Sequence, residues 1–169
     1  MEERLAVSGI AVKDGGTLVA RDAQVDLPEA SLMTTDMNMP GGTTAIPARA
    51  QFESMEATIY TKSLDGTTAR LKAPGLHKIE VRWLEDVADR QGNIVPRGTR
   101  VYIEGLMKSW SDGSPTKGEL SEATVGYEVV LYQMWNEQGA ELVFIDKRTG
   151  IYRVGGVDYT TSAMSFLGL

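Results

Sequence analysis

Apolar and polar residues alternate along most of this 169-residue chain, and a repeat of two residues is the pattern of a half-buried β-strand. The clearest alternation covers residues 77–87, where apolar side chains occupy one face and charged side chains the other. Two more long segments, 100–110 and 118–135, follow the same pattern, with a bend expected near Gly126. Shorter segments of this kind lie at 5–12, 17–27, 51–59, 141–146 and 151–154. The chain is therefore predicted to be mainly β.

The three long segments exceed the usual strand length of about five or six residues. Stretches rich in Gly, Pro, Asp and Ser separate them, which is the composition of turns, so we expect long hairpins. Hairpins that extend past their own core indicate a sheet that continues into another subunit. The alternative is a large twisted sandwich with solvated hairpins.

One segment, 63–73, has helical spacing instead. Leu64 and Leu71 are seven residues apart, Asp65 can support the first turn, and a Pro-Gly dipeptide follows. We expect a single short helix at the side of the sheet.

The segment 28–50 joins two predicted strands and is much longer than the usual connection of about four to six residues. It is mostly polar but contains Met33, Met37 and Met39, and Pro40 followed by two glycines predicts a turn or a flexible elbow. Apolar side chains that a segment cannot bury locally indicate an arm that lies on a neighbouring copy of the chain. We therefore expect one domain, 1–169, that carries an arm at 28–50.

The composition argues against an enzyme. The chain has no cysteine, so it has no disulfide and no thiolate metal site. Its one histidine, His77, cannot supply a site that needs two imidazoles, and we expect it on the polar surface. The acidic group Glu85, Asp86 and Asp89 lies at a hairpin end, where we expect solvated charge. We predict no catalytic residue, no cofactor and no metal.

The formal net charge is −6, and no cluster of Lys and Arg stands out along the sequence, which argues against tight binding of nucleic acid. The three tryptophans lack interleaved basic residues and are expected to anchor the core or strand pairs: Trp83, Trp110 and Trp135. No apolar run approaches the roughly twenty residues that span a bilayer, and the start MEERLAV lacks the order of a signal peptide. We expect no membrane anchor and a cytoplasmic location before assembly.

Four short motifs occur in an order that resembles one family. They are VDLP at 25–28, LVFID at 142–146, VGGVD at 154–158 and the final Gly-Leu. Together with the polar arm and the helix, they resemble the major tail tube protein of contractile-tailed bacteriophages and of related phage-tail-like bacteriocins. The resemblance runs from about residue 7 to the end, and the acidic start departs from the basic, apolar start of the family.

The resemblance implies a β-sandwich or barrel-like subunit with one flanking helix. Six subunits would form a ring, with long hairpins joined into an inner β-barrel, and rings would stack into the hollow tube of a contractile tail. The tube would conduct DNA, which passes without specific binding, or pierce a target envelope. The implied partners are other copies of the chain, the tail sheath protein, the baseplate or tail initiator, the tail terminator and the tape measure protein. The implied location is the virion tail or the bacteriocin particle, after assembly in the host cytoplasm.

Within this resemblance the arm is the ring-stacking device, with methionines as adaptable apolar contacts. Its candidate residues are Met33, Met37, Met39, Pro40 and Gly41. A wall that conducts DNA should be neutral or acidic, because a cationic wall holds phosphate. The candidate lumen-facing residues are Glu80, Glu104 and Glu128, although Arg82 and Lys108 on the same strands leave the face assignment open.

Two alternatives remain. A tube subunit of a bacterial secretion system would share the fold and lose the DNA. A β-barrel ligand-binding module or enzyme would instead need a concave site with convergent polar groups, for which the sequence offers no candidate.

Overall fold

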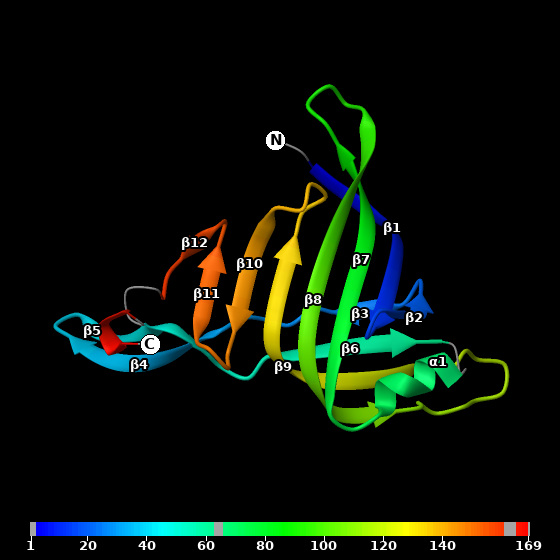
Figure 1. The fold of residues 1–169 in the computed structure, drawn as a ribbon, viewed down its shortest axis with the longest axis horizontal. Helices are drawn as coiled ribbons and strands as arrows, with labels where there is room; N and C mark the ends of the chain where they lie inside the picture. The colour runs from blue at the N-terminus through cyan, green and yellow to red at the C-terminus, as the bar shows by residue number, and fades with distance from the viewer. Residues whose placement is uncertain (1–2, 63–65, 161–164, 169) are drawn as a thin grey trace.

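The structure, a computed structural model, describes residues 3–62, 66–160 and 165–168, and it is mainly β with one short α-helix, as the sequence predicts (Figure 1). The strands are β1 (Glu3–Asp14), β2 (Thr17–Arg21), β3 (Gln24–Asp26), β4 (Leu32–Met39), β5 (Gly42–Phe52), β6 (Glu56–Thr61), β7 (Leu76–Ala88), β8 (Ile94–Ser111), β9 (Ala123–Trp135), β10 (Glu141–Asp146), β11 (Ile151–Val154) and β12 (Val157–Asp158). The helical elements are α1 (Gly66–Ala69) and the 3₁₀ turn η1 (Arg70–Lys72).

One large antiparallel sheet follows the order β12-β11-β10-β9-β8-β7-β1-β2, and it forks at β9. Residues 131–135 of β9 pair with β10, whereas residues 123–128 pair with β6, which in turn pairs with β3. Only Asp22 and Ala23 separate β2, which pairs with β1, from β3, which pairs with β6. This short connection brings the β6–β3 branch of the fork back towards β1. Asp22 has φ 51° in this connection. The subunit is therefore barrel-like, although among the described strands the hydrogen-bonded ladder itself does not close.

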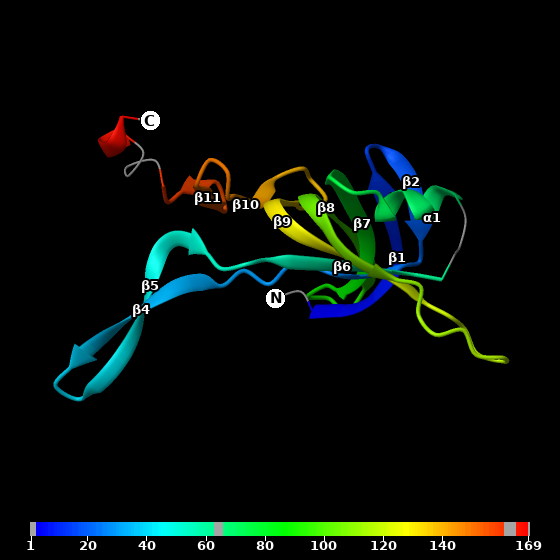
Figure 2. The ribbon, with the colours of Figure 1, turned by 90° about the horizontal axis from the view of Figure 1, so that it is seen from below.

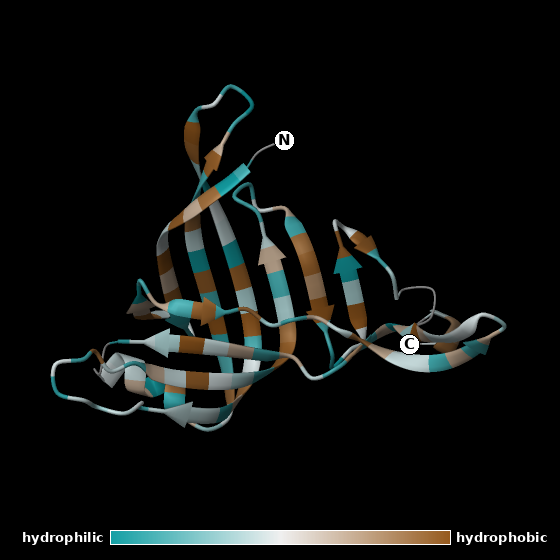
Figure 3. Ribbon diagram, turned by 180° about the vertical axis from the view of Figure 1, so that it is seen from behind, coloured by the Kyte–Doolittle hydropathy of each residue, from teal (hydrophilic) through white to brown (hydrophobic). Residues whose placement is uncertain are grey.

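The core lies on the inner side of this bent sheet, where alternate residues of the long strands are buried. Figure 3 shows the resulting bands of hydrophobic and hydrophilic residues along these strands. Tyr127 of β9 is fully buried, and its hydroxyl donates a 2.5 Å hydrogen bond to the carbonyl of Leu71 in η1. This bond and the buried Leu71 side chain fix the helical segment against the sheet.

The long β9 begins at Ala123 rather than at the predicted residue 118, and residues 112–122 form a loop. Gly113 and Gly118 have φ values of 74° and 87°, which a continuing strand cannot adopt. The helix is also shorter than predicted, since α1 and η1 cover residues 66–72, and predicted positions 63–65 lie outside the described residues.

His77 is buried, so the prediction of a surface histidine is wrong. Its Nδ1 lies 2.8 Å from the Asp14 carboxylate and its Nε2 lies 2.6 Å from the carbonyl of Ala73. The histidine joins the end of η1 to β1.

The arm is a β-hairpin, not a loop. Strands β4 and β5 form a separate two-stranded sheet, and the residues that turn between them are Pro40 and Gly41. Figure 2 shows this hairpin extending away from the rest of the molecule. The turn at Pro40 was predicted, but the two strands beside it were not.

Candidate functional site

The outward face of the sheet, defined here as the side of β7, β8 and β9 opposite the core, carries a cross-strand set of polar residues. In the register of the sheet, Glu80 lies opposite Tyr102, and Tyr102 lies opposite Gln133. The Tyr102 hydroxyl donates a 2.9 Å hydrogen bond to Glu104, two residues along β8. Burial, and then this bond to a carboxylate, raises the pKa of Tyr102 to about 12. Glu80 and Glu104 therefore belong to one connected polar surface.

Each of the three predicted lumen carboxylates has a cationic neighbour. Glu80 forms an ion pair with Arg82, and Glu104 forms one with Arg148. The Glu128 carboxylate accepts hydrogen bonds of 2.8 and 2.9 Å from the Ser54 hydroxyl and lies 3.9 Å from the Lys108 ammonium.

The pairing places Arg82 and Lys108 on the same face as the carboxylates. Positive and negative side chains therefore lie beside one another on this face, so it is not an acidic surface. Tyr102 lies opposite Glu80 and donates its hydrogen bond to Glu104, so it stands between these two carboxylates. Glu128 lies elsewhere on the face, on β9, opposite Leu106.

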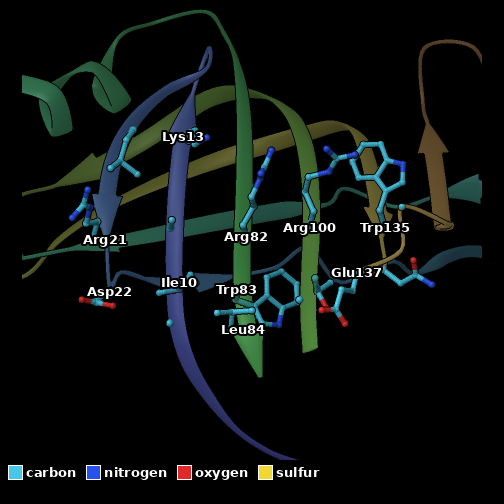
Figure 4. A pocket seen from close by; sticks show the side chains of 17 residues that line it. Ile10, Lys13, Arg21, Asp22, Arg82, Trp83, Leu84, Arg100, Trp135 and Glu137 are labelled. Atoms are coloured by element: carbon cyan, nitrogen blue, oxygen red, sulfur yellow. The ribbon is translucent and has the colours of Figure 1, made fainter. Parts of the chain in front are cut away.

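A row of arginines crosses this face. The register aligns Arg21 of β2 with Ala11 of β1, then with Arg82 of β7, Arg100 of β8 and Trp135 of β9. The Arg100 guanidinium lies over the Trp135 ring, with its central carbon 4.2 Å from the ring centroid. Figure 4 shows these side chains projecting from neighbouring strands.

The row lies in an open groove of about 830 Å³. Lys13 and the three arginines supply the positive charges that line the groove, and Asp22 and Glu137 supply negative ones. Other residues, such as Trp83 and Leu84, add apolar surface. Sequence reasoning missed this site because its arginines are 18 to 79 positions apart, and only the register of the folded sheet aligns them.

The arm presents a second candidate surface. Met33, Met37 and Met39 occupy alternate positions of β4 and so share one side of the hairpin, together with Ile46 of β5, which lies opposite Thr35. Their exposed fractions are 48%, 48%, 44% and 37%. On the other side, the Thr43 hydroxyl donates a 3.2 Å hydrogen bond to Asn38. The hairpin is therefore amphipathic, and its apolar side is open to solvent.

The sheet also has open edges. Strand β1 pairs with β7 along its length, but on its other side only residues 11–14 pair with β2. Residues 3–9 thus form an edge that no other described strand covers, and Leu5 and Val7 on it are 53% and 57% exposed. At the other end of the sheet, the path ends in the two-residue β12, where Val157 is exposed.

The acidic group at the end of β7 differs from the prediction of solvated charge. Glu85 is buried, forms an ion pair with Arg4 and accepts a 2.9 Å hydrogen bond from the Trp83 indole. The hydrogen bond from Arg4 holds the pKa of Glu85 below its usual range. Asp89 accepts bonds from the turn that follows, which lowers its pKa as well. These carboxylates have structural partners, and among the described residues no group of three or more His, Cys, Asp or Glu could hold a metal ion.

The three tryptophans have different surroundings in the structure. Trp83 packs against the core and Trp135 stacks with Arg100, as strand anchors would. Trp110 is 51% exposed and so lies outside the core; it pairs with Val125 across β8 and β9, beneath the Lys72 ammonium, which is 4.8 Å from the ring centroid. No helix of the described segments is long and apolar enough to cross a membrane.

A family model described as "Phage tail tube protein FII" matches residues 10–168. The chain is similar to a chain in the structure of an extracellular contractile injection system, the PVC sheath-tube complex in its extended state, with 12% identity, coverage of 75% of this chain and 88% of that chain, and a TM-score of 0.52. A chain of the anti-feeding prophage (AFP) baseplate matches with 11% identity, coverage of 78% and 96%, and a TM-score of 0.47. At such identities the first likeness concerns the fold alone. No curated protein matches.

Proposed function

The chain belongs to the phage tail tube protein FII family, and we propose that six copies form a ring and that the rings stack into the hollow inner tube of a contractile tail. The family match across residues 10–168 is the observation that carries this proposal. The proposed role is structural, not enzymatic. Two features of the subunit support it: a sheet with two open ends and an amphipathic arm.

The ring is proposed to close through the sheet ends. The open edge of β1 at residues 3–9 would pair with the β11–β12 end of the next copy, which is a head-to-tail contact between different surfaces. Such a contact closes into a ring when its rotation divides a full turn. Closure removes edges that would otherwise promote aggregation, and it extends the long strands into one continuous barrel.

The arm is proposed to join the rings. Met33, Met37 and Met39 would lie against the next ring, with Pro40 and Gly41 at the tip of the hairpin. An isolated two-stranded hairpin is only marginally stable in water. Packing of its apolar side on a neighbour would therefore order the arm as the tube grows.

The outward sheet face, which carries Glu80, Glu104 and Glu128, is proposed to line the lumen. Because each carboxylate has a cationic neighbour, this wall has little net charge along its centre. DNA could pass such a wall without being held at one sequence, or the tube could pierce a target envelope. The proposed partners are the sheath, which accompanies the tube in the similar injection-system complex, the baseplate or tail initiator, the tail terminator and the tape measure protein.

Electron microscopy of the purified chain, with and without a tail initiator, tests the proposal. We expect six-fold rings or tubes, and sedimentation should show species larger than a monomer. A compact monomer at every concentration, even with the initiator present, would contradict the proposed assembly.

A further inference from the structure

The arginine row is unusual for an acidic protein. Arg82 and Arg100 lie directly opposite each other on β7 and β8, and like charges in this position destabilise a sheet. Glu80 offsets the charge of Arg82. Among the described residues, no carboxylate forms an ion pair with Arg21 or Arg100, and the stack on Trp135 uses the face of the Arg100 guanidinium, not its N–H donors. The groove therefore holds more guanidinium than its own carboxylates neutralise.

The row has a defined length. Neighbouring strands lie about 4.8 Å apart, and three spacings separate β2 from β8, so the row from Arg21 to Arg100 extends over about 14 Å. Duplex DNA carries one negative charge per about 1.7 Å of its axis, so about eight phosphate charges lie within this length. A guanidinium can bind phosphate oxygens with two parallel hydrogen bonds. The spacing and the chemistry both fit a repeating chain of phosphates.

We propose that this groove binds the phosphate backbone of nucleic acid through Arg21, Arg82 and Arg100, without contact to the base edges. The inference rests on the proposed function, because it states how DNA meets the tube wall. Arg82 lies on the same face as Glu80, to which it is bonded. If that face lines the lumen, each ring of six copies carries six such rows of guanidinium groups.

Each row is expected to bind phosphate weakly, because carboxylates lie beside its arginines. Glu80 competes with phosphate for Arg82, and Asp22 and Glu137 also line the groove. With at most three phosphate contacts for each subunit, affinity should fall about 40-fold between about 50 and about 200 mM salt. Such contacts centre the duplex at each ring and release it easily, because no base is read.

The test uses a fluorescently labelled DNA duplex of about 20 base pairs, titrated with the full chain while its anisotropy is measured at several salt concentrations. The variant Arg21→Gln/Arg100→Gln should lower the slope of log affinity against log salt by about two. Arg21→Gln alone, whose side chain is exposed, should lower it by about one and guards against misfolding of the double variant. Arg90→Gln, in the turn between β7 and β8, removes a single positive charge outside the groove and should leave the slope unchanged.

Three results would overturn the inference: no salt-dependent binding by the wild type, an equal loss in Arg90→Gln and Arg21→Gln, or displacement of the duplex by polyglutamate at equal or lower charge concentration. The last result would assign the groove to an acidic polypeptide instead. Electron microscopy of the same samples separates the two proposals. Absence of rings with arginine-dependent binding intact would contradict the tube and leave the groove assignment standing.

Discussion

Among the pairs of oppositely charging side chains that the structure describes, His77 and Asp14 are the most buried, and they join η1 to the sheet. In the variant His77→Leu, the Asp14 carboxylate would remain buried without its partner. We expect the free energy of unfolding to fall by about 3 kcal/mol, as is common when one member of a buried pair is removed. Urea titration measures the loss. His77→Leu/Asp14→Asn should lose less, and a loss under about 1 kcal/mol in the single variant would contradict the role of the pair.

Tyr102 and Tyr132 should resist ionisation. Burial raises the pKa of each to about 12, and for Tyr102 the bond to Glu104 adds to the effect. In the unfolded chain these tyrosines have pKa values of about 10. Between about pH 10 and about pH 12 the unfolded state therefore binds fewer protons than the folded state. Stability should therefore fall as the pH rises through this interval. Phenolate absorbance and melting temperature measure both effects, and Tyr102→Phe should reduce the fall. Native titration of both residues near pH 10 would contradict the prediction.

At the scale of elements, the proposed stacking role of the arm can be tested separately from folding. Met37→Asp/Met39→Asp places two charges on the apolar side of β4, where contact with a neighbour would cost several kcal/mol unless the charges are paired. The subunit should melt normally, because the hairpin lies outside the core, and long tubes should be absent in electron micrographs. Thr34→Asp/Asn38→Asp adds the same charge to the other side of the hairpin and should leave the tubes intact.

Tubes of normal length in the methionine variant would show that the arm does not join the rings. The loop at 112–117, which projects from the end of β8, would then be the next segment to test.

The accuracy of the sequence predictions differs between elements for physical reasons. Strands at 141–146 and 151–154 were located exactly as the structure has them, since alternation and turn residues agree there. The pattern failed at 118–122, where the positive φ of Gly118 is incompatible with a strand. It also failed at the arm, because a hairpin without a core face lacks strong alternation, although three methionines at odd positions already shared one side. The arginine row and the buried His77 depend on register between distant segments, which no local pattern contains.

At the scale of the whole molecule, the proposed ring would close through the open edge of β1. Leu5→Lys/Val7→Lys places two charges on this edge, and lysine is a residue that natural edge strands use to prevent pairing. We expect normal melting but no rings, measured by sedimentation and electron microscopy. Lys substitutions at Thr116 and Glu119, in the exposed loop, provide a control that should still form rings. Rings in the edge variant would place the contact between copies elsewhere.

The ladder between β7 and β8 continues without a shift from Leu76 to Ala88, whereas the ladder between β8 and β9 shifts twice. A load applied along the strands would be shared by the whole uninterrupted ladder, because its hydrogen bonds act in parallel. At the two shifts the bonds are irregular and the strand bends, so fewer bonds share the load there. Under such a load the β7–β8 ladder would be stiffer than the β8–β9 ladder, and elastic deformation would concentrate between β8 and β9.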